Sequence, residues 1–362
     1  MRFCCFYQQK LQQNSTTNAM DFCLSNGVKS TTYPTKISTN MPINLSKSIA
    51  KMHKLGIASH TNYAFSQLTT LAVGGPIALT IFPTQTSQLV NAAKYLTKHN
   101  VPFCVLGKGS NILASDNPFD GVVIATKNLN GVCANGTFVT ADCGTPTAKV
   151  AQLCVAKGLS GGEFLACLPA SVGGVTICNA GCFGQCAQDI VHSVKVLHNG
   201  VIKTLSNIQC NFTHRNSIFK NSNYVILQVT FCFAQSTATQ VAHKIQWMKC
   251  QKSKTQPLGS KTAGCVLYNA NVPLSKLIDE AGLKGYQIGQ AKVSKKHAGF
   301  VINIDKSSAK DIYLIIQYIQ QVLLERYNVT SMVELNLLNF AEGTNDILPI
   351  HQDRNHQNSP SP

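Results

Sequence analysis

A glycine-rich stretch, from Gly161 to Gly184, constrains what this chain can fold into more than any other segment. Each glycine costs backbone entropy inside a helix or strand, so the stretch predicts a shaped loop instead of a helix interior or a continuous strand. Glycine also lets the main chain approach a ligand and point bare N–H groups at anionic oxygens, such as those of a pyrophosphate. A tight structural turn is the alternative, although one or two glycines would be enough for it. The stretch therefore favours a ligand-binding loop.

The length and the cysteines narrow the class of protein. The chain has 362 residues, more than a single hydrophobic core usually supports, so we expect two or three domains. No run of eighteen apolar residues occurs, which argues against a membrane span. The 15 cysteines are an odd number in a long chain without a secretory signal. We predict that most of them are reduced and act as buried, small apolar side chains.

The net charge of +16 at pH 7 comes mainly from missing acids, since no Asp or Glu occurs between Asp21 and Asp116. The Lys and Arg residues are scattered, and the densest doublet of the folded part is Lys295-Lys296. A nucleic-acid-binding protein would need clustered basic residues with interleaved aromatic side chains, which disfavours that class. The charge indicates anionic small ligands.

Both ends of the chain have the composition of polar extensions. Residues 1–51 are rich in Ser, Thr, Asn and Gln and lack helical or strand periodicity, so we predict a disordered extension without catalytic residues. The same composition suits a transit peptide. Three folded parts are expected at residues 60–125, 126–235 and 236–342, followed by a polar tail at residues 343–362.

Order is expected to begin near Leu68, with a strand–helix–strand unit. The predicted elements are a strand at Ile77–Phe82, a helix capped by Thr84 or Thr86 with Leu89, Val90, Ala93 and Leu96 on one face, and a strand at Phe103–Leu106. The second strand runs straight into Gly107, at the carboxyl end where α/β folds bind ligands. A nicotinamide-binding Rossmann fingerprint would need a glycine where Ile112 stands, so that fold is not predicted.

The second folded part reads as another α/β unit, and the third as helices packed on strands. In the second part, strands are predicted at Val122–Ala125, Phe138–Ala141, Val191–Leu197 and Val225–Phe233, with a helix at Thr147–Ala156 closed by Gly158. In the third part, helices are predicted at Gln240–Lys249, Leu274–Ala281 and Ala309–Arg326, the last with an apolar face of Ile312, Ile315, Ile316, Ile319, Val322 and Leu323.

Glu334 is the most informative single acid. In a strand from Ser331 to Leu338, alternation would place Glu334 on the face of Met332 and Asn336, opposite the apolar residues between them. A solvated outer face is one interpretation of this position. A functional carboxyl is the other, because an acid on an apolar strand is costly unless it is solvated or used.

Cys265 and Arg215 are the other candidates for chemistry. A thiol with an ordinary pKa near 8.5 is mostly protonated at pH 7 and can donate a proton, although packing alone would also explain a cysteine. Arg215 stands in a polar turn, where it is either an exposed solubilising residue or a clamp for a carboxylate or phosphate. Cys178, Cys182 and Cys186 are spaced by four, but glycines between them break any helix and no Cys-x-x-Cys pair occurs, so no metal site is predicted.

Together these segments resemble the UDP-N-acetylenolpyruvoylglucosamine reductase family, in its shorter variety without an extra substrate-closing loop. The resemblance covers about residues 60–340, and the order of its motifs along the chain makes it specific. The matching segments include Gly-x-Gly-Ser-Asn-x-Leu at Gly107–Leu113 and Arg-x-Ser-x-Phe at Arg215–Phe219. The others are Thr69–Pro76, Gly161–Gly174, Asn179–Gly184, Ala263–Ala270, Ala281–Gly285, Val293–Ala298 and Val333–Glu334.

The resemblance implies a fold that combines α+β and α/β features. It implies a FAD-binding domain of two α+β subdomains, of the vanillyl-alcohol-oxidase type, at residues 60–125 and 126–235, and an α+β substrate domain at residues 236–342. It also implies FAD and NADPH as cofactors. NADPH would reduce the flavin and leave, and the enolpyruvyl ether of a UDP-sugar would take its place and be reduced to UDP-N-acetylmuramate for peptidoglycan synthesis.

The family's functional residues carry over to matching positions of this sequence. Catalytic roles fall on Cys265 as proton donor, and on Arg215 and Glu334 as stabilisers of the developing enolate, with Glu334 acting in its protonated form or through a water. FAD-binding roles fall on Gly74, Gly75, Gly107, Lys108, Gly109, Ser110, Asn111, Ile112, Pro169, Ala170, Ser171, Val172, Gly173, Gly174, Asn179, Ala180 and Gly181. Substrate-binding roles fall on His214, Ser217, Asn269, Lys254 and His297.

Several positions depart from the family pattern. His214 stands where a Tyr is usual, and Ala170 replaces a loop glycine, which is acceptable if its φ is negative. Tyr268 and Ala270 replace a basic residue and a Pro. The basic residue expected before Gln-Pro is displaced, and Lys254 is a near match for it. These departures bear on substrate affinity more than on catalysis.

The sequence therefore predicts a FAD- and NADPH-dependent reductase that acts on a UDP-sugar as a monomer, without nucleic acid or membrane partners. The expected location is the cytoplasm, or the plastid stroma if residues 1–51 are a transit peptide. A flavin oxidase of the same fold and a non-catalytic flavoprotein are the rival hypotheses. The joint presence of Cys265, Arg215 and Glu334 disfavours both.

Overall fold

The computed structural model of the protein describes residues 45–340. Its first element is helix α1 (Leu45–Lys54), whose Met52 side chain is fully buried and which contacts the first sheet. The prediction of a disordered extension is therefore wrong for residues 45–51. Apolar Leu45, Ile49 and Met52 recur at helical spacing, a signal that the polar composition of the whole extension obscured. The rest of that extension, with its transit-peptide alternative, and the polar tail lie outside the described residues.

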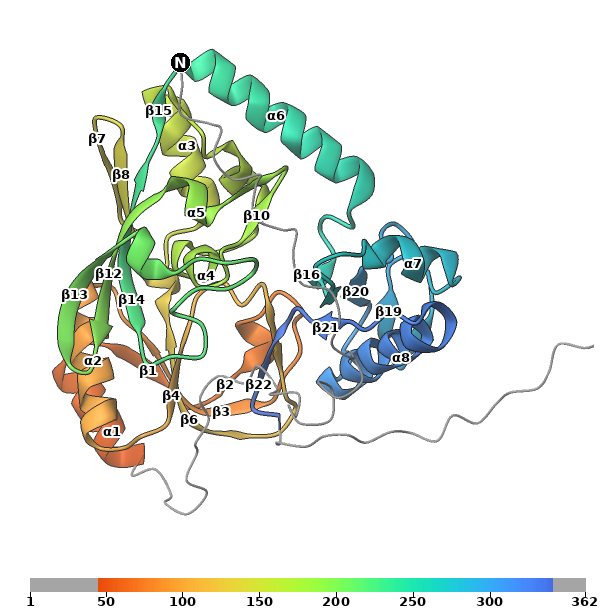
Figure 1. Ribbon diagram of the computed structural model, residues 1–362. Helices are drawn as coiled ribbons and strands as arrows, with labels where there is room; N and C mark the ends of the chain where they lie inside the picture. Colours follow the sequence, from red (N-terminus) through yellow and green to blue (C-terminus); the bar gives the residue numbers. More distant parts are fainter. Residues whose placement is uncertain (1–44, 341–362) are drawn as a thin grey trace, which may run out of the picture. The chain divides into compact units, whose positions relative to one another are not determined.

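Three parallel strands form the centre of the first sheet (Figure 1). Its strands are β1 (Ala58–His60), β2 (Tyr63–Ala64), β3 (Pro76–Phe82), β4 (Phe103–Leu106) and β6 (Phe119–Ala125). Strand β6 lies between β3 and β4 and is parallel to both, and helix α2 (Thr86–Lys98) connects β3 to β4. The predicted strand–helix–strand unit is thus confirmed, but the N-cap of its helix is Gln85 and not Thr84 or Thr86. Order begins well before Leu68, since β1 and β2 pair with β3.

The second sheet is antiparallel throughout, so its unit is α+β and the α/β interpretation of this part is wrong. Its strands, in spatial order, are β13 (Val201–Ser206), β12 (Val191–His198), β14 (Val225–Cys232), β8 (Phe138–Asp142) and β7 (Val132–Asn135). Helix α3 (Thr147–Lys157) ends at Gly158, which has the left-handed conformation (φ 62°) predicted for a glycine cap. Short strands β9 (Leu159–Ser160) and β15 (Ala234–Gln235) pair beside it.

The glycine-rich stretch is only partly a loop. It contains the 3-10 helix η3 (Glu163–Cys167), the helix α4 (Val172–Ile177) and a hairpin of β10 (Gly181–Cys182) and β11 (Gln185–Cys186), which leads into α5 (Ala187–Ile190). The prediction that no helix forms here is wrong for α4, which encloses two glycines. Ser171 caps α4 by accepting a hydrogen bond from Gly174 N at 3.3 Å, and Gly173 packs closely on Cys143, whose backbone O would lie 3.1 Å from a Cβ at this position.

The third part contains a four-stranded antiparallel sheet and three helices, of which the last packs on the sheet and the first packs on α3 and η3. Its strands are β16 (Lys261–Cys265), β20 (Phe300–Asn303), β19 (Ala291–Val293) and β18 (Gln287–Ile288), and its helices are α6 (Ala238–Thr255), α7 (Leu274–Glu280) and α8 (Ala309–Tyr327). Helix α6 leads into this part from β15 (Figure 1). All six apolar residues predicted for one face of α8 are buried. The remaining short helices are η1 (Phe65–Gln67), η2 (Thr126–Asn128) and η4 (Ile208–Cys210).

The last strand changes partners at Glu334. Strand β21 (Met332–Val333) pairs with β17 (Leu267–Tyr268), whereas β22 (Asn336–Leu338) runs parallel to β5 (Ile112–Ala114). The prediction of one alternating strand is therefore wrong. Met332 is 56% exposed, but Asn336, which alternation places on the same face, is buried. The change of partner turns the chain between the two short strands and places Glu334 beside the loop that precedes β5.

The described cysteines carry no disulfide among themselves, but the prediction that most are buried is wrong. Only three of the twelve are buried, namely Cys143, Cys154 and Cys210. The physical reason is that several of the others face a large cavity instead of a core.

Glu163 is a buried carboxyl that joins the glycine-rich stretch to α6. Its side chain is 1% exposed and accepts hydrogen bonds from Ser160 Oγ (2.7 Å), Gly161 N (3.0 Å) and Lys244 Nζ (3.1 Å). Burial raises the pKa of Glu163, but the hydrogen bonds from Ser160, its own backbone, Lys244 and Gly161 outweigh it and leave the pKa below the ordinary 4.5. The ionised form therefore stabilises the fold above that pH, and this contribution is lost as the pH falls through the lowered pKa.

We expect Glu163→Gln to lower the free energy of unfolding by about 1–3 kcal/mol at pH 7.5, because one charged partner of a buried hydrogen-bonded cluster is lost. Urea unfolding at pH 7.5 and below pH 4 measures this, and the gap from wild type should narrow at the lower pH. Glu280→Gln, which removes the exposed pair with Lys276, is the matched control and should cost under about 0.5 kcal/mol. Equal costs for the two variants would contradict this account of Glu163.

Candidate active site

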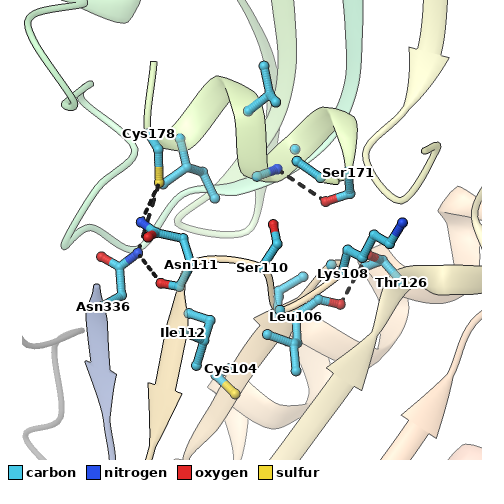
Figure 2. Close-up of a pocket in the computed structure, with 18 of the residues that line it drawn as sticks. Cys104, Leu106, Lys108, Ser110, Asn111, Ile112, Thr126, Ser171, Cys178 and Asn336 are labelled. Carbon is cyan, nitrogen blue, oxygen red and sulfur yellow. Dashed lines mark hydrogen bonds between the residues drawn. The ribbon is translucent and has the colours of Figure 1, made fainter. Parts of the chain in front are cut away.

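A cavity of about 1650 Å³ is lined by all three parts of the fold. This volume exceeds the roughly 300–1,000 Å³ of sites for single drug-sized ligands, so it has room for a dinucleotide and a second ligand. Its lining includes the loop after β4, the segment around α4 and the end of β16, together with Arg215 and Glu334. Figure 2 shows the part of this lining formed by the β4 loop and the segment from Ser171 to Cys178.

The loop after β4 approaches α4 more closely than a side chain would permit. A Cβ atom on Gly107 would overlap Ser171 Oγ, so any other residue here would displace the hydroxyl that caps α4. Within residues 45–340, the backbone N–H groups of Gly107, Lys108, Gly109 and Ser110 donate to no other residue. Unpaired N–H groups at the wall of a cavity form a cradle for anionic oxygens. The site therefore has the donors that a pyrophosphate needs.

Asn111 ties this loop to the C-terminal strand. Its Nδ2 donates to Glu334 O at 3.2 Å, and its own carbonyl accepts from the backbone N (3.0 Å) and Nδ2 (3.2 Å) of Asn336. Both amide side chains also contact Cys178 Sγ, at 3.8 and 3.9 Å (Figure 2). These bonds fix the main chain of Glu334 relative to the loop.

Arg215 and Glu334 form an ion pair at the cavity wall. Arg215 Nε lies 3.0 Å from Glu334 Oε1, and the Glu334 side chain is only 15% exposed, which disfavours the solvated-face interpretation. Burial raises the pKa of Glu334 above its ordinary 4.5, and the nearby charges of Arg215, His214 and Lys220 oppose that rise without cancelling it. Arg215 itself has a left-handed backbone (φ 55°), an uncommon conformation for a long side chain that is often retained at functional sites.

Cys265 lies at the end of β16 and lines the same cavity. Burial raises the pKa of its thiol to about 11; Glu334 adds to the rise, and Arg215 and Lys252 oppose it. The thiol is therefore protonated at neutral pH. Gly299 packs beside it, since a Cβ there would lie 3.2 Å from Cys265 Sγ. The structure thus brings together the three residues for which the sequence predicted catalysis.

Most residues predicted to bind the cofactor line the cavity. They are Gly107, Lys108, Gly109, Ser110, Asn111, Ile112, Pro169, Ala170, Ser171, Gly173, Gly174, Ala180 and Gly181. Ala170 does not have a positive φ, so it replaces a loop glycine without strain.

Four of the predicted cofactor residues lie outside the lining. Gly74 and Gly75 pack against the chain at residues 114–117, where a Cβ would overlap neighbouring atoms. Val172 is fully buried, and Asn179 bonds the backbone on both sides, donating to Thr213 O and accepting from Gln188 N. These residues shape the site instead of facing it.

The five residues predicted to bind substrate are likewise absent from the lining. Ser217 Oγ donates to Ile177 O (2.7 Å), Asn269 Nδ2 donates to Thr330 O (2.8 Å), and His297 Nδ1 accepts from Gly299 N (3.2 Å). The His214 ring lies 6.0 Å from that of Tyr268, and Lys254 is exposed on α6. Their substrate-binding roles stay predictions.

Lys252, which the sequence reasoning missed, lines the cavity where Lys254 does not. Helix α6 buries Val241, Ile245 and Met248, and Lys252 continues this stripe four residues later. Helical spacing could have identified it, whereas counting back from the Gln-Pro pair pointed to Lys254.

Within residues 45–340, no group of three or more His, Cys, Asp or Glu side chains is placed to hold a metal ion. In the same range, every helix is too short or too polar to cross a membrane.

Comparison with known proteins shows which family the chain belongs to. Residues 77–206 match the FAD binding domain family, and residues 256–338 match the UDP-N-acetylenolpyruvoylglucosamine reductase C-terminal domain. The reductase of Caldanaerobacter subterraneus is 33% identical over 294 residues, which are 81% of this chain and 96% of the relative. The chain belongs to the UDP-N-acetylenolpyruvoylglucosamine reductase family. A second relative in this family, from Clostridium novyi, is 33% identical over 76% of this chain and 91% of its own length.

The crystal structure of a UDP-N-acetylenolpyruvylglucosamine reductase from Thermus caldophilus has a similar fold, with a TM-score of 0.67 at 25% identity. The similarity covers 78% of this chain and 98% of the Thermus chain. The predicted fold, a FAD-binding domain followed by a C-terminal α+β domain, is confirmed. The chain is an oxidoreductase with a FAD-binding domain, from a family that acts in peptidoglycan synthesis. The segment that matches the FAD binding domain includes both the β4 loop and the segment around α4.

We expect Gly107→Ala to weaken FAD binding about 5- to 150-fold, because overpacking of this kind costs roughly 1–3 kcal/mol. Flavin absorbance per mole of purified protein measures the loss, and circular dichroism reports whether the variant folds. Gly136→Ala is the control, since a Cβ there meets nothing within 4 Å. Wild-type flavin content in a folded Gly107→Ala protein would contradict the close approach of the loop to Ser171.

We expect alkylation of Cys265 by iodoacetamide to quicken about tenfold for each pH unit between pH 8 and 10, because only the thiolate reacts and the pKa is about 11. Quantitative mass spectrometry of the Cys265 peptide gives the rate, with the peptide of exposed Cys133 as internal reference. A rate that levels off by pH 9 would show that the thiol is not shielded as described.

Proposed function

We propose that the chain catalyses the NADPH-dependent, FAD-mediated reduction of UDP-N-acetylglucosamine enolpyruvate to UDP-N-acetylmuramate. The observation that carries this proposal is the meeting of a protonated thiol, a guanidinium and a buried carboxyl in one cavity with a pyrophosphate cradle. The names of the relatives and the FAD-binding match support the same reaction.

The residues of the β4 loop and of α4 would hold the FAD. The free N–H groups from Gly107 to Ser110 suit the pyrophosphate, and Lys108 adds a positive charge. Bound FAD would accept a hydride from NADPH and deliver it to the substrate carbon β to the carboxylate. The cavity has volume for a nucleotide ligand beside the flavin, which is needed if NADPH and the UDP-sugar use it in turn.

Arg215 would stabilise the substrate carboxylate as negative charge develops on it. Its Nε is held by Glu334, and its terminal amino groups bond no other described residue, so they are available to a ligand. The 3.0 Å contact favours an ionised Glu334 in the resting site, because a carboxylate orients the guanidinium. Transfer of charge into the carboxylate then occurs beside a fixed cation, which is where electrostatic stabilisation is most effective.

Cys265 would donate the proton to the carbon α to the carboxylate. Its raised pKa keeps the proton on sulfur at neutral pH, and the thiolate left after donation is stabilised by Arg215 and Lys252, which both lower that pKa. The proton is then regained from solvent. In this scheme Cys265 supplies the proton, and Arg215, held by Glu334, stabilises the negative charge that develops on the substrate.

We expect Cys265→Ala to slow the step that consumes the UDP-sugar by about 10²- to 10⁴-fold, the usual worth of a general acid, and Cys265→Ser to recover part of it. Stopped-flow absorbance of NADPH-reduced protein mixed with the enolpyruvyl sugar follows the return of oxidised flavin. Reduction by NADPH should be unchanged, and Cys133→Ala, at an exposed cysteine, is the control.

Two results would overturn the proposed function. One is a purified protein without bound flavin. The other is a reduced flavin that the sugar leaves unchanged while oxygen reoxidises it, as an oxidase of the same fold would behave.

We also propose that the chain acts as a monomer in the cytoplasm, on a small-molecule UDP-sugar without nucleic acid. Apart from Val201 and Ile202 on β13 and the rings of Phe183 and Trp247, the large exposed apolar side chains of the described part lie singly on different elements, such as Ile208 on η4 and Leu324 on α8, which supports a monomer. Light scattering should give a mass near the 39.1 kDa of one chain.

A further inference from the structure

Two exposed aromatic side chains form a pair that the fold does not explain. Phe183 is 38% exposed and Trp247, on α6, is 55% exposed, and their ring centroids lie 5.8 Å apart. Trp247 is the only tryptophan of the chain. Two large rings that pack on each other but remain open to solvent gain little from folding, so they form a surface available to a ligand.

Phe183 is also held in an unfavourable backbone conformation. It occupies the first central position of the two-residue turn between β10 and β11, with φ 56°, and Gly184 follows with φ 75°. Turns with positive φ at both positions are normally built from Asn, Asp or Gly. A bulky side chain there costs roughly 1–2 kcal/mol, and such strain persists mainly where a side chain has a function.

Phe183 lies next to the cavity wall, although neither ring is part of the lining itself. Gly181 and Cys182, immediately before Phe183, line the cavity, and Lys252 lines it from α6. Lys252 follows Trp247 by five residues, a rise of about 7.5 Å along the helix and a rotation of about 140° around it, so Trp247 lies beside the lining instead of in it. Its Nζ donates to Cys167 O at 2.7 Å, which fixes the ammonium group on the cavity side while leaving two of its protons free.

We propose that Phe183 and Trp247 form a stacking platform for the heteroaromatic base of a nucleotide ligand, with Lys252 contacting its phosphates. The inference rests on the proposed function, in which a nucleotide enters the cavity with its reacting group at Cys265. A nucleotide ligand has a reacting end, anionic phosphates and a flat base, and the structure offers Cys265, Lys252 and the ring pair as partners for these in turn. The base comes from the UDP-sugar, from the nicotinamide dinucleotide, or from both when they use the cavity in alternation.

Trp247 reports directly on this platform, because all tryptophan emission comes from it. We expect titration of the flavin-loaded protein with UDP-N-acetylglucosamine, NADP⁺ or both to quench that emission saturably as a base stacks on the indole. Quenching by the UDP-sugar alone assigns the platform to uracil, and quenching by NADP⁺ alone assigns it to the dinucleotide. Binding of both ligands by calorimetry without any change in emission would overturn the proposal.

Substitutions separate the rings from the turn that carries one of them. Phe183→Asn removes the ring but suits the left-handed turn, and Trp247→Ala removes the indole. Base stacking is worth about 1–3 kcal/mol, so each variant should weaken binding of the ligand that quenches Trp247 by about 5- to 150-fold. Trp247→Phe should restore most of the affinity, and Leu324→Ala, at an exposed position on α8, should leave it unchanged.

The stacking platform and the proposed function are tested by different results. Affinities within twofold of wild type in both ring variants, with flavin turnover on the enolpyruvyl sugar intact, would overturn the platform and leave the proposed function standing. Flavin that NADPH does not reduce would overturn the proposed function, while nucleotide titration of Trp247 would still decide the platform.

Discussion

The parallel pairing of β22 with β5 is the interaction on which the rest of the site depends. It joins Asn336 near the end of the fold to Ile112, directly after the loop that forms the pyrophosphate cradle. Glu334 lies between this pairing and that of β21 with β17, and its backbone N–H donates to Val266 O at 2.9 Å. Because both sides of Glu334 are held by strands, its carboxyl is fixed opposite Arg215. The ion pair is therefore a product of long-range topology.

Burial raises the pKa of both the Cys265 thiol and the Glu334 carboxyl, and Arg215 opposes the rise in both. Burial raises the pKa of Cys265 to about 11 and keeps the proton available, and the Glu334 charge adds to that rise. For Glu334, the rise caused by burial is opposed by Arg215. One cation thus stabilises the carboxylate beside it and, after proton transfer, the thiolate. Cys265 can donate a proton beside Glu334 because Arg215 stabilises the negative charge on either side chain.

Local signals in the sequence predicted the local structure. The apolar spacing of α8 and the glycine that closes α3 depend on neighbours along the chain, and both were confirmed. The helix α4 was missed because glycine content outweighed the capping signal of Ser171, whose bond to Gly174 N stabilises a helix that propensity disfavours. The break at Glu334 was missed because the pairing partners of β21 and β22 are more than 60 residues away in sequence.

The motif order identified the family, and it located the catalytic candidates better than the substrate contacts. Cys265, Arg215 and Glu334 line one cavity, but Lys252 takes the place on the lining that motif counting gave to Lys254. A motif fixes positions along the chain, whereas facing a cavity depends on the phase of a helix, which the residues before the motif determine.

The most direct test of the central claim is a double-mutant cycle on Arg215 and Glu334, measured as the single-turnover rate at which the enolpyruvyl sugar reoxidises the reduced flavin. If Glu334 acts by holding the guanidinium, Glu334→Gln should slow this rate in the wild-type background and add little once Arg215→Lys is present. If the two effects multiply in the double variant, the residues act independently, and the account of a shared, strand-fixed ion pair is contradicted.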